Sequence, residues 1–284
     1  MKPLLAVTAA MVALVLPGGL VGAESEVEDK WRYNLFNPTP ADQMREMSTD
    51  RPDQTESAYT VDAGHFQVEM DLVSAVFDRS GDVQTRGWGT SLNLKAGLLN
   101  NVDIQFVLEP YASVRQKDLQ SGDAMTLSGF GEFQTRVKVN LWGNDGGKTA
   151  MAIMPFIEWP LPESDLRNGE TEGGIILPWA VELPAGWGLG GIVEFDFVSD
   201  GGDGRDTEYF NTIALSHDIV GNLGAYVEFA ALLTPENGVD WQGQVDVGFT
   251  YALNQNTQFD FGCNFGVTDS APDFNPFIGF SWRL

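Results

Sequence analysis

The sequence is poor in the residues that build catalytic and metal sites. Its 284 residues include one cysteine, Cys263, and two histidines, His65 and His217. A lone cysteine excludes an intramolecular disulfide, and two histidines without cysteine partners make a poor zinc site. A hydrolase needs a serine and a histidine within hydrogen-bonding reach, oriented by a third group, and nothing around these two histidines indicates one. We therefore expect no enzyme activity, no cofactor and no metal site.

Positive charge is also scarce. The chain has 16 lysines and arginines against 40 aspartates and glutamates, a formal net charge of −24. Because phosphates would be repelled, nucleic acid is not an expected partner, whereas acidic loops could attract cations. The stretch Asp200–Asp206 lacks the twelve-residue spacing and the closing glutamate of a calcium loop. We expect a flexible acidic loop there.

Long apolar runs are lacking too. The longest, Leu4–Leu16, is interrupted at Pro17-Gly18-Gly19, before it reaches the roughly 20 residues of a membrane-spanning helix. With Lys2 before it and Val21-Gly22-Ala23 after it, this run has the pattern of a signal peptide. No cysteine follows the cleavage site, so a lipid anchor is not expected. We expect residues 1–23 to be a signal peptide and the protein to be exported.

What the sequence does contain is two-residue alternation, most clearly in Leu127–Trp142. Apolar or small residues occupy every second position, and charged or polar residues occupy the positions between them, with Phe130 as the one large apolar exception before the closing Trp142. Since side chains alternate across a strand, this stretch predicts a long strand with one apolar and one charged face. A strand of a soluble sandwich is usually about 5–6 residues long, whereas a membrane-spanning strand needs about 9–11. The length favours a membrane barrel.

The alternation repeats from Gly64 to the end of the chain. It is least regular in Met151–Trp159 and Glu208–Ile219. The predicted strands are His65–Phe77, Gly87–Leu98, Val102–Val114, Leu127–Trp142, Met151–Trp159, Gly173–Leu183, Gly188–Val198, Glu208–Ile219, Leu223–Leu233, Trp241–Leu253, Thr257–Val267 and Pro276–Leu284. Their number is even, as in bacterial single-chain barrels.

Short and long connections alternate along these strands. Asn100-Asn101 and Gly221-Asn222 are of the short kind, and Arg79–Arg86 and Gln116–Thr126 are of the long kind. Outer-membrane barrels have short periplasmic turns and long external loops, and closure leaves no unpaired strand edge in lipid. A secreted lectin-like or glycanase-like sandwich is the alternative, but it explains neither strand length nor loop alternation. The sequence predicts an all-β transmembrane antiparallel barrel over residues 64–284, with about 12 strands, in the outer membrane.

The polar faces of these strands are predicted to line the barrel interior. One interpretation is a structural network of ion pairs that fills it; the other is a pore whose acidic excess favours cations. The residues predicted to line a candidate solute path are Glu69, Asp71, Lys95, Asp103, Gln105, Glu109, Glu132, Arg136, Lys138, Glu194, Asp196, Glu228, Asp246, Asp260 and Arg283.

Residues 24–63 precede the alternation and are not expected to belong to the barrel wall. Two interpretations stay open: a periplasmic lead-in, or a plug-like segment that docks at the barrel mouth or inside it. In the second, Arg51 would lie beside inward carboxylates. The motif residues singled out here are Asp50, Arg51, Pro52, Asp53 and Glu56.

The stretch Ser48–Glu69, STDRPDQTESAYTVDAGHFQVE, resembles the N-terminal signature of a known family. That signature is Ser-Thr-Asp-Arg-Pro-Asp, then Thr-Val and a Gly ahead of a Gln-x-Glu strand, and it is similar to the outer-membrane transporters grouped as the "MetA-pathway of phenol degradation" family. Gly97-Leu98 and Asn101–Gln105 resemble the family's turn between its second and third strands. The resemblance covers residues 48–284 and implies an outer-membrane barrel that takes up aromatic or hydrophobic compounds.

The last residues, Phe280–Leu284, resemble the assembly signal on the final strand of such barrels, although they end in Leu284 rather than in an aromatic residue. The resemblance implies contact with outer-membrane lipid and recognition by the barrel-assembly machinery. The predicted function is that of a channel or transporter for small, aromatic or hydrophobic, solutes. The alternative is a structural or surface-interaction barrel with a closed lumen and acidic external loops.

Overall fold

The computed structural model describes residues 30–161, 166, 169–202, 204–235 and 241–284. The expected signal peptide, residues 1–23, and the start of the N-terminal segment, residues 24–29, lie outside the described residues. Within the described part of the chain, no helix has the length and apolar character that crossing a membrane requires. Two short 3-10 turns are present, η1 (Lys30–Arg32) and η2 (Pro184–Gly186).

The described residues contain thirteen strands in one antiparallel sheet. They are β1 (Phe66–Ser80), β2 (Val83–Leu99), β3 (Val102–Asp118), β4 (Ala124–Gly129), β5 (Phe133–Trp142), β6 (Thr149–Glu158), β7 (Glu172–Glu182), β8 (Trp187–Ser199), β9 (Arg205–Val220), β10 (Leu223–Leu233), β11 (Gln242–Asn254), β12 (Thr257–Gly266) and β13 (Phe274–Arg283).

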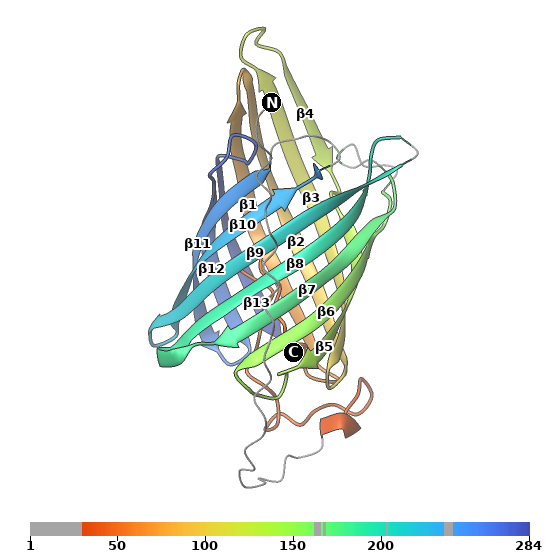
Figure 1. Cartoon of the computed structure of the whole chain (residues 1–284), viewed down its shortest axis with the longest axis vertical. Helices are drawn as coiled ribbons and strands as arrows, with labels where there is room; N and C mark the ends of the chain where they lie inside the picture. The colour runs from red at the N-terminus through yellow and green to blue at the C-terminus, as the bar shows by residue number, and fades with distance from the viewer. Residues whose placement is uncertain (1–29, 162–165, 167–168, 203, 236–240) are drawn as a thin grey trace, which may run out of the picture.

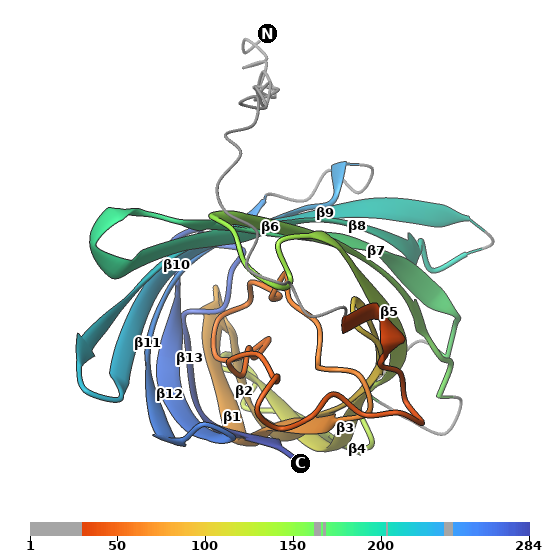
Figure 2. The ribbon, with the colours of Figure 1, turned by 90° about the horizontal axis from the view of Figure 1, so that it is seen from below.

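The sheet closes on itself. β1 pairs with both β2 and β13, and β2 pairs with β3, so the strand order returns to its start. β4 and β5 both pair with β3 and together occupy one position in the ring. Figure 2 looks along the barrel and shows the closed wall. The expected twelve-stranded antiparallel barrel is confirmed, with one strand in two pieces.

The wall has its apolar face outward. On β10, Val227 and Phe229 expose 45% and 39% of their surface, whereas Glu228 between them exposes 1%. Its partner across β11, Asp246, exposes 0%, and the next residue, Val247, exposes 39%. This pattern is the reverse of a soluble core and matches an apolar band facing lipid.

The strand predicted at Leu127–Trp142 is broken between Gly129 and Phe133. Glu109 of β3 bridges the gap, because its amide donates to the Glu132 carbonyl and its carbonyl accepts from the Gly131 amide, each at 2.9 Å. A Cβ on Gly131 would lie 1.5 Å from Oε2 of Glu109. The glycine therefore makes room for this carboxyl, and regular pairing stops where the side chain crosses.

Part of what was expected to be external loop is strand. β1 runs to Ser80 and β2 starts at Val83, so the connection predicted at Arg79–Arg86 shrinks to Gly81 and Asp82. Gly81 has a φ of 58°, a left-handed conformation that suits a tight turn. Figure 1 shows the ends of β1 to β4 rising above the rest of the wall.

The N-terminal segment enters the barrel from the end with the short turns. Its two ends are tied to β2, because the Leu35 amide donates to the Leu98 carbonyl at 2.9 Å and the Gly64 amide donates to the Gly97 carbonyl at 2.8 Å. Between these ties the chain runs inside the ring, in orange in Figure 2. A Cβ on Gly97 would lie 2.0 Å from the carbonyl oxygen of Asp62, so this glycine permits the close approach.

Candidate functional site

Residues Ser48–Ser57, hereafter the crossing loop, span the interior of the barrel. The loop is closed at its base by a 2.6 Å hydrogen bond between the hydroxyls of Ser48 and Ser57. The Ser57 amide also donates to Oδ1 of Asp50 at 2.8 Å. Above this base the loop contacts side chains from β1, β2, β5 and β9 to β12. It therefore reaches opposite sides of the wall.

Asp50 is the centre of the loop's charged contacts. Its carboxylate accepts from Lys138 at 2.5 Å and from Lys95, which also pairs with Glu69. Its amide donates to Oε2 of Glu69 at 3.0 Å. Burial alone would raise the pKa of Asp50, but the ammonium groups of Lys138 and Lys95 hold it well below its usual range. The two ammonium groups therefore favour the ionised form of this carboxyl.

Arg51 links the loop to the wall on either side of β13. Its Nη1 lies 2.8 Å from Oδ1 of Asp71 on β1. Its Nη2 and Nε donate to the two oxygens of Asp260 on β12, at 2.8 and 3.3 Å. The guanidinium lies 5.8 Å from the centre of the Phe277 ring, and a Cβ on Gly279 would come within 2.1 Å of Nη2. The fork geometry of arginine suits this two-carboxylate contact.

Gln54 and Thr55 hold the far side of the loop with neutral groups. The Gln54 amide N–H donates to Glu228 at 2.8 Å, and its side chain donates to Asp246 at 2.6 Å. The Thr55 hydroxyl donates to Glu228 and lies near the Thr212 hydroxyl, each at 2.5 Å. No basic side chain takes part in these contacts. The two carboxyls are thus held only by uncharged donors from the loop.

The two remaining acids of the loop behave differently from Asp50. Burial first, and the neighbouring Glu228 second, raise the pKa of Asp53 well above its usual range. Burial and the charge of Asp50 likewise raise the pKa of Glu56 to about 7, although Arg136 on β5 pairs with it and opposes the rise. Oε2 of Glu56 has no hydrogen-bond donor among the described residues. Glu56 is therefore the loop carboxyl whose charge changes near neutral pH.

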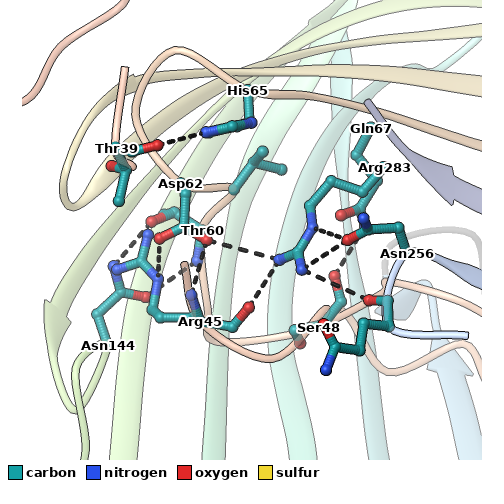
Figure 3. Close-up of polar contacts among 12 residues, drawn as sticks. Thr39, Arg45, Ser48, Thr60, Asp62, His65, Gln67, Asn144, Asn256 and Arg283 are labelled. Carbon is teal, nitrogen blue, oxygen red and sulfur yellow. Dashed lines mark hydrogen bonds and ion pairs between the residues drawn. The ribbon is translucent and has the colours of Figure 1, made fainter. Parts of the chain in front are cut away.

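A second polar cluster fixes the segment at the short-turn end of the barrel (Figure 3). Asp62 forms ion pairs with Arg45, with 3.1 Å between Nε and Oδ1, and with Arg283, with 3.5 Å between Nη1 and Oδ2. Arg283 also donates to the Arg45 carbonyl at 2.8 Å and to Oδ1 of Asn256 at 2.9 and 3.0 Å. This cluster ties the segment to the final strand, β13, and to the turn before β12.

The structure brings many of the predicted interior residues to the N-terminal segment. Those in direct contact with the crossing loop are Glu69, Asp71, Lys95, Arg136, Lys138, Glu228, Asp246 and Asp260. Asp103 accepts from the Val61 amide at 3.0 Å, and Gln105 donates to Asp103 at 3.1 Å. Of the motif residues, Pro52 accepts from the Tyr226 hydroxyl at 3.4 Å.

Among the described contacts, Glu132, Glu194 and Asp196 have no hydrogen bond or ion pair to the N-terminal segment. Glu109 lies beside Gly131 at the gap between β4 and β5. Glu194 and Asp196 lie within hydrogen-bonding reach of each other on β8. They are on the part of β8 that leads to its external end. The expected interior set is therefore divided between the loop and the wall beyond it.

Sequence reasoning missed an apolar patch on the inner wall. Met154, Ile176 and Ile192 form a buried cluster, with Phe156 and Phe210 packed against it. Ile176 is the cross-strand partner of Met154, and Phe210 is the partner of Glu194, which places all of them on the inward face. The signal was the weak alternation in the strands that became β6 and β9, because large apolar residues there occupy inward positions.

Gln54 and Thr55 were also missed as functional residues, because a search for charged groups passes over neutral donors. Neither histidine lies in a catalytic arrangement. His65 contacts the carbonyls of Thr39 and Leu284, and His217 stacks on Trp187 with ring centres 4.5 Å apart. In the described part of the chain, no three His, Cys, Asp or Glu side chains are grouped so as to hold a metal ion.

Charge is distributed unevenly around the wall. Between Thr149 and Trp282 the sequence has 20 acidic residues and 2 basic ones, Arg167 and Arg205. The strand bases that meet the N-terminal segment, Lys95, Arg136, Lys138 and Arg283, come from β2, β5 and β13. None of the described strands from β6 to β12 carries a lysine or arginine except at Arg205, the first residue of β9. One half of the wall is therefore mixed in charge, and the other half is acidic.

A cavity of about 750 Å³ lies beside the loop on this acidic half. Arg51, Pro52 and Asp53 line it from the loop, and Tyr226 lines it from β10. It reaches the residues of the short turn between β7 and β8, including Gly186. The loop therefore leaves open space next to β8–β11 on the short-turn side.

Comparison with known proteins agrees with this architecture. The family described as "Putative MetA-pathway of phenol degradation" matches residues 49–284. The COG4313 outer membrane channel from Pseudomonas putida F1 is similar in structure, with a TM-score of 0.59, 11% identity, and coverage of 84% of this chain and 100% of that one. The NanC porin gives a TM-score of 0.52 at 10% identity, covering 76% and 100%. At such identity these likenesses show the fold alone. No curated protein matches the chain significantly.

Proposed function

We propose a function from one premise: the chain belongs to the MetA-pathway of phenol degradation family, whose match spans residues 49–284. The protein is an outer-membrane β-barrel, with a closed wall and an apolar outer face. On this basis it is a passive channel for small solutes, and the crossing loop is the plug that occupies its interior at rest. It is not an enzyme.

The observation that carries this proposal is the span of the crossing loop. Arg51 contacts β1 and β12, Gln54 contacts β10 and β11, and Glu56 contacts β5. A solute that passes from one end of the barrel to the other must move past these contacts. Polar and ionic contacts of this kind can be exchanged without unfolding the wall, because the wall is held by its own strand pairing.

The family description and the inner wall together support solutes with an apolar part. The buried cluster of Met154, Ile176 and Ile192 gives β6–β8 an apolar inner surface next to the loop. The free energy of moving an apolar or aromatic compound from water into such a passage is more favourable than into one lined by charges alone. The proposal also includes recognition of β13 by the barrel-assembly machinery, supported by its outward Ile278 and Trp282.

A reversible cross-link tests the plug. The hydroxyls of Thr55 and Thr212 lie 2.5 Å apart, a separation that suits a disulfide between the substituted side chains. Thr55→Cys/Thr212→Cys, in a Cys263→Ser background, would join the loop to β9. Single-channel current in a planar bilayer is then recorded before and after reduction. The matched control is Ser48→Cys/Ser57→Cys, which closes the loop on itself without tying it to the wall.

We expect current steps from the unmodified protein, none from the oxidised Thr55→Cys/Thr212→Cys protein, and steps again after reduction. The control should conduct in both states. Current that ignores the cross-link would mean that the loop does not close the path. Silence from every protein, with folding verified by heat-modifiable gel mobility, would favour a structural or surface-interaction barrel with a closed lumen.

A further inference from the structure

The acidic pair Glu228 and Asp246 lacks a positive partner. The two residues lie directly opposite each other on β10 and β11, and both are buried. Among the described residues neither takes part in an ion pair, and the loop donors that reach them are the neutral groups of Gln54 and Thr55. Like charges directly opposite across two strands destabilise each other. When both carboxyls are ionised, no basic side chain among the described residues balances their charge.

A single atom shows where the balancing group would bind. Oδ1 of Asp246 is buried and meets no hydrogen-bond donor among the described residues. The carboxyls of Asp246 and Glu228 lie within hydrogen-bonding reach of each other, so the orphan oxygen is placed beside a second acid. A buried acceptor without a donor is unfavourable. A ligand with a charged N–H group would donate a hydrogen bond to Oδ1 of Asp246 and reduce the repulsion between the two carboxyls.

We propose that Glu228 and Asp246 are the recognition site of the channel for an organic cation: an ammonium or amidinium group on a small apolar body. Gln54 and Thr55 occupy this site when no cation does. The inference rests on the proposed channel function and names its solute class. No three His, Cys, Asp or Glu side chains are grouped to hold a metal ion in the described residues, whereas two neighbouring carboxylates can accept the N–H groups of one ammonium or amidinium.

The surroundings of the pair fit both parts of such a ligand. Thr212, which meets Thr55, is the cross-strand partner of Ile192 in the apolar cluster. Phe210 lies two residues before Thr212 on the same face of β9 and packs against that cluster. An apolar body could therefore lie against β8 and β9 while its charged group meets the carboxyls. An aromatic ring suits this wall better than a fully hydrated ion.

The path on either side of the pair is acidic. Toward the external end, Glu194 and Asp196 face inward on β8, and no inward lysine or arginine is present in the described residues of β6–β12. Toward the short turns, the cavity of about 750 Å³ is lined by Asp53, Glu182 and Asp218. A series of like charges in a low-dielectric channel concentrates counter-ions. A cation displacing Gln54 and Thr55 would leave through this cavity.

The test uses two probes of one shape and opposite charge, benzylammonium and benzoate. Reversal potentials are measured for the full-length protein in gradients of benzylammonium chloride and sodium benzoate. The variant Glu228→Gln/Asp246→Asn keeps groups that hydrogen-bond to Gln54 and Thr55 but removes both charges. Its matched control, Asp123→Asn/Asp269→Asn, removes two exposed charges that lie outside the strands. Should the double variant not fold, Asp246→Asn alone replaces it.

We expect benzylammonium to be favoured over benzoate by about tenfold in the unmodified protein and in the control. The preference should fall to a few-fold or less in Glu228→Gln/Asp246→Asn. Preference for benzoate, or a preference unchanged by the variant, would overturn the inference while leaving the channel intact.

A binding measurement keeps the inference separate from the channel. Benzylammonium should raise the thermal unfolding midpoint of the full chain in detergent micelles, as any ligand of the folded state does, and benzoate should not. Glu228→Gln/Asp246→Asn should lose this shift. If no protein conducts but the shift is present and needs the pair, the channel proposal fails and the cation site stands. If the shift is absent from the unmodified protein, the site is refuted.

Discussion

The crossing loop is held by two regions of the wall that use different chemistry. Toward β12, β1, β2 and β5, charged groups of the loop meet opposite charges: Asp50 meets two lysines, Arg51 meets two aspartates, and Glu56 meets Arg136. Toward β9, β10 and β11, Gln54 and Thr55 meet acids with neutral donors. We refer to these as the paired side and the acidic side.

The difference shows which contacts can open. Removing one partner of a buried ion pair typically costs about 3–5 kcal/mol, since the other charge is left uncompensated. A neutral hydrogen bond is worth only about 0.5–1.5 kcal/mol net. The loop is therefore fixed on its paired side and exchangeable on its acidic side, where the cavity lies. A moving loop would pivot on Asp50 and Arg51 and swing away from β9–β11.

The largest expected effect comes from breaking the paired side. Arg51→Met would leave Asp71 and Asp260 without their partner. We expect a loss of about 3–5 kcal/mol in the free energy of unfolding, measured by urea titration in micelles, and a constantly open channel. Arg79→Met, at an exposed site on β1, is the control. A loss below about 1 kcal/mol would show that the paired side does not fix the loop.

A smaller effect is expected from pushing the same contact aside. Gly279→Ala places a Cβ where it would come within 2.1 Å of Nη2 of Arg51. The guanidinium must shift, and overpacking of this kind costs about 1–3 kcal/mol. The open time of the channel should rise in the same direction as for Arg51→Met. Combining both changes should add little, because each acts on one contact; full additivity would mean that Gly279 acts elsewhere.

The acidic side should be easier to disturb without loss of the barrel. Gln54→Ala removes the side-chain donor to Asp246 and Gln244. We expect about 1 kcal/mol of lost stability but a clear increase in open time, recorded in the same bilayer experiment. Gln54→Glu is the informative partner, because it adds a third carboxyl and should open the channel further. Unfolding losses equal to those of Arg51→Met would remove the distinction between the two sides.

The smallest effect is graded and follows pH. Burial raises the pKa of Glu56 from 4.5 to about 7, so the docked loop holds this proton more tightly than a free one. The docked loop is therefore stabilised fully at a pH below 4.5, the pKa of the undocked carboxyl, and this stabilisation is lost as the pH rises through about 7. Open time should therefore increase from acidic to mildly alkaline pH. Glu56→Gln should flatten this profile, and a profile that survives the substitution would assign the titration to another group.

Much of the wall could be predicted from the sequence, because lipid requires a strict pattern. Each strand must turn one face outward to the apolar lipid chains. Alternation such as that around Glu228 therefore predicts the strand, its outward face and its place in the membrane. The prediction failed where a local contact interrupts the pattern. At the break before Phe133, the side chain of Glu109 from β3 lies against Gly131, and alternation within one strand carries no information on such a neighbour.

Less of the site could be predicted, because alternation shows which side of the wall a side chain faces but not which residue it contacts. One of the two interpretations of residues 24–63 placed Arg51 beside inward carboxylates. Alternation could not select Asp71 and Asp260 from the other acids, since that depends on register and on the course of the loop. The division of the wall into two charge regions follows from which strands carry Lys95 and Lys138. The sequence does not show that the crossing loop lies between these two regions and contacts each with different groups.

The order of the loop's partners along the chain has a consequence for how the barrel is made. Asp50 reaches Glu69 and Lys95 at separations of 19 and 45 residues, whereas Gln54 reaches Asp246 at 192 and Arg51 reaches Asp260 at 209. Contacts close in sequence form sooner than distant ones. The loop would therefore bind β1 and β2 first and contact β11 and β12 later. During that interval the loop is bound to the early strands, and its contacts with β11 and β12 form only when those strands join the barrel.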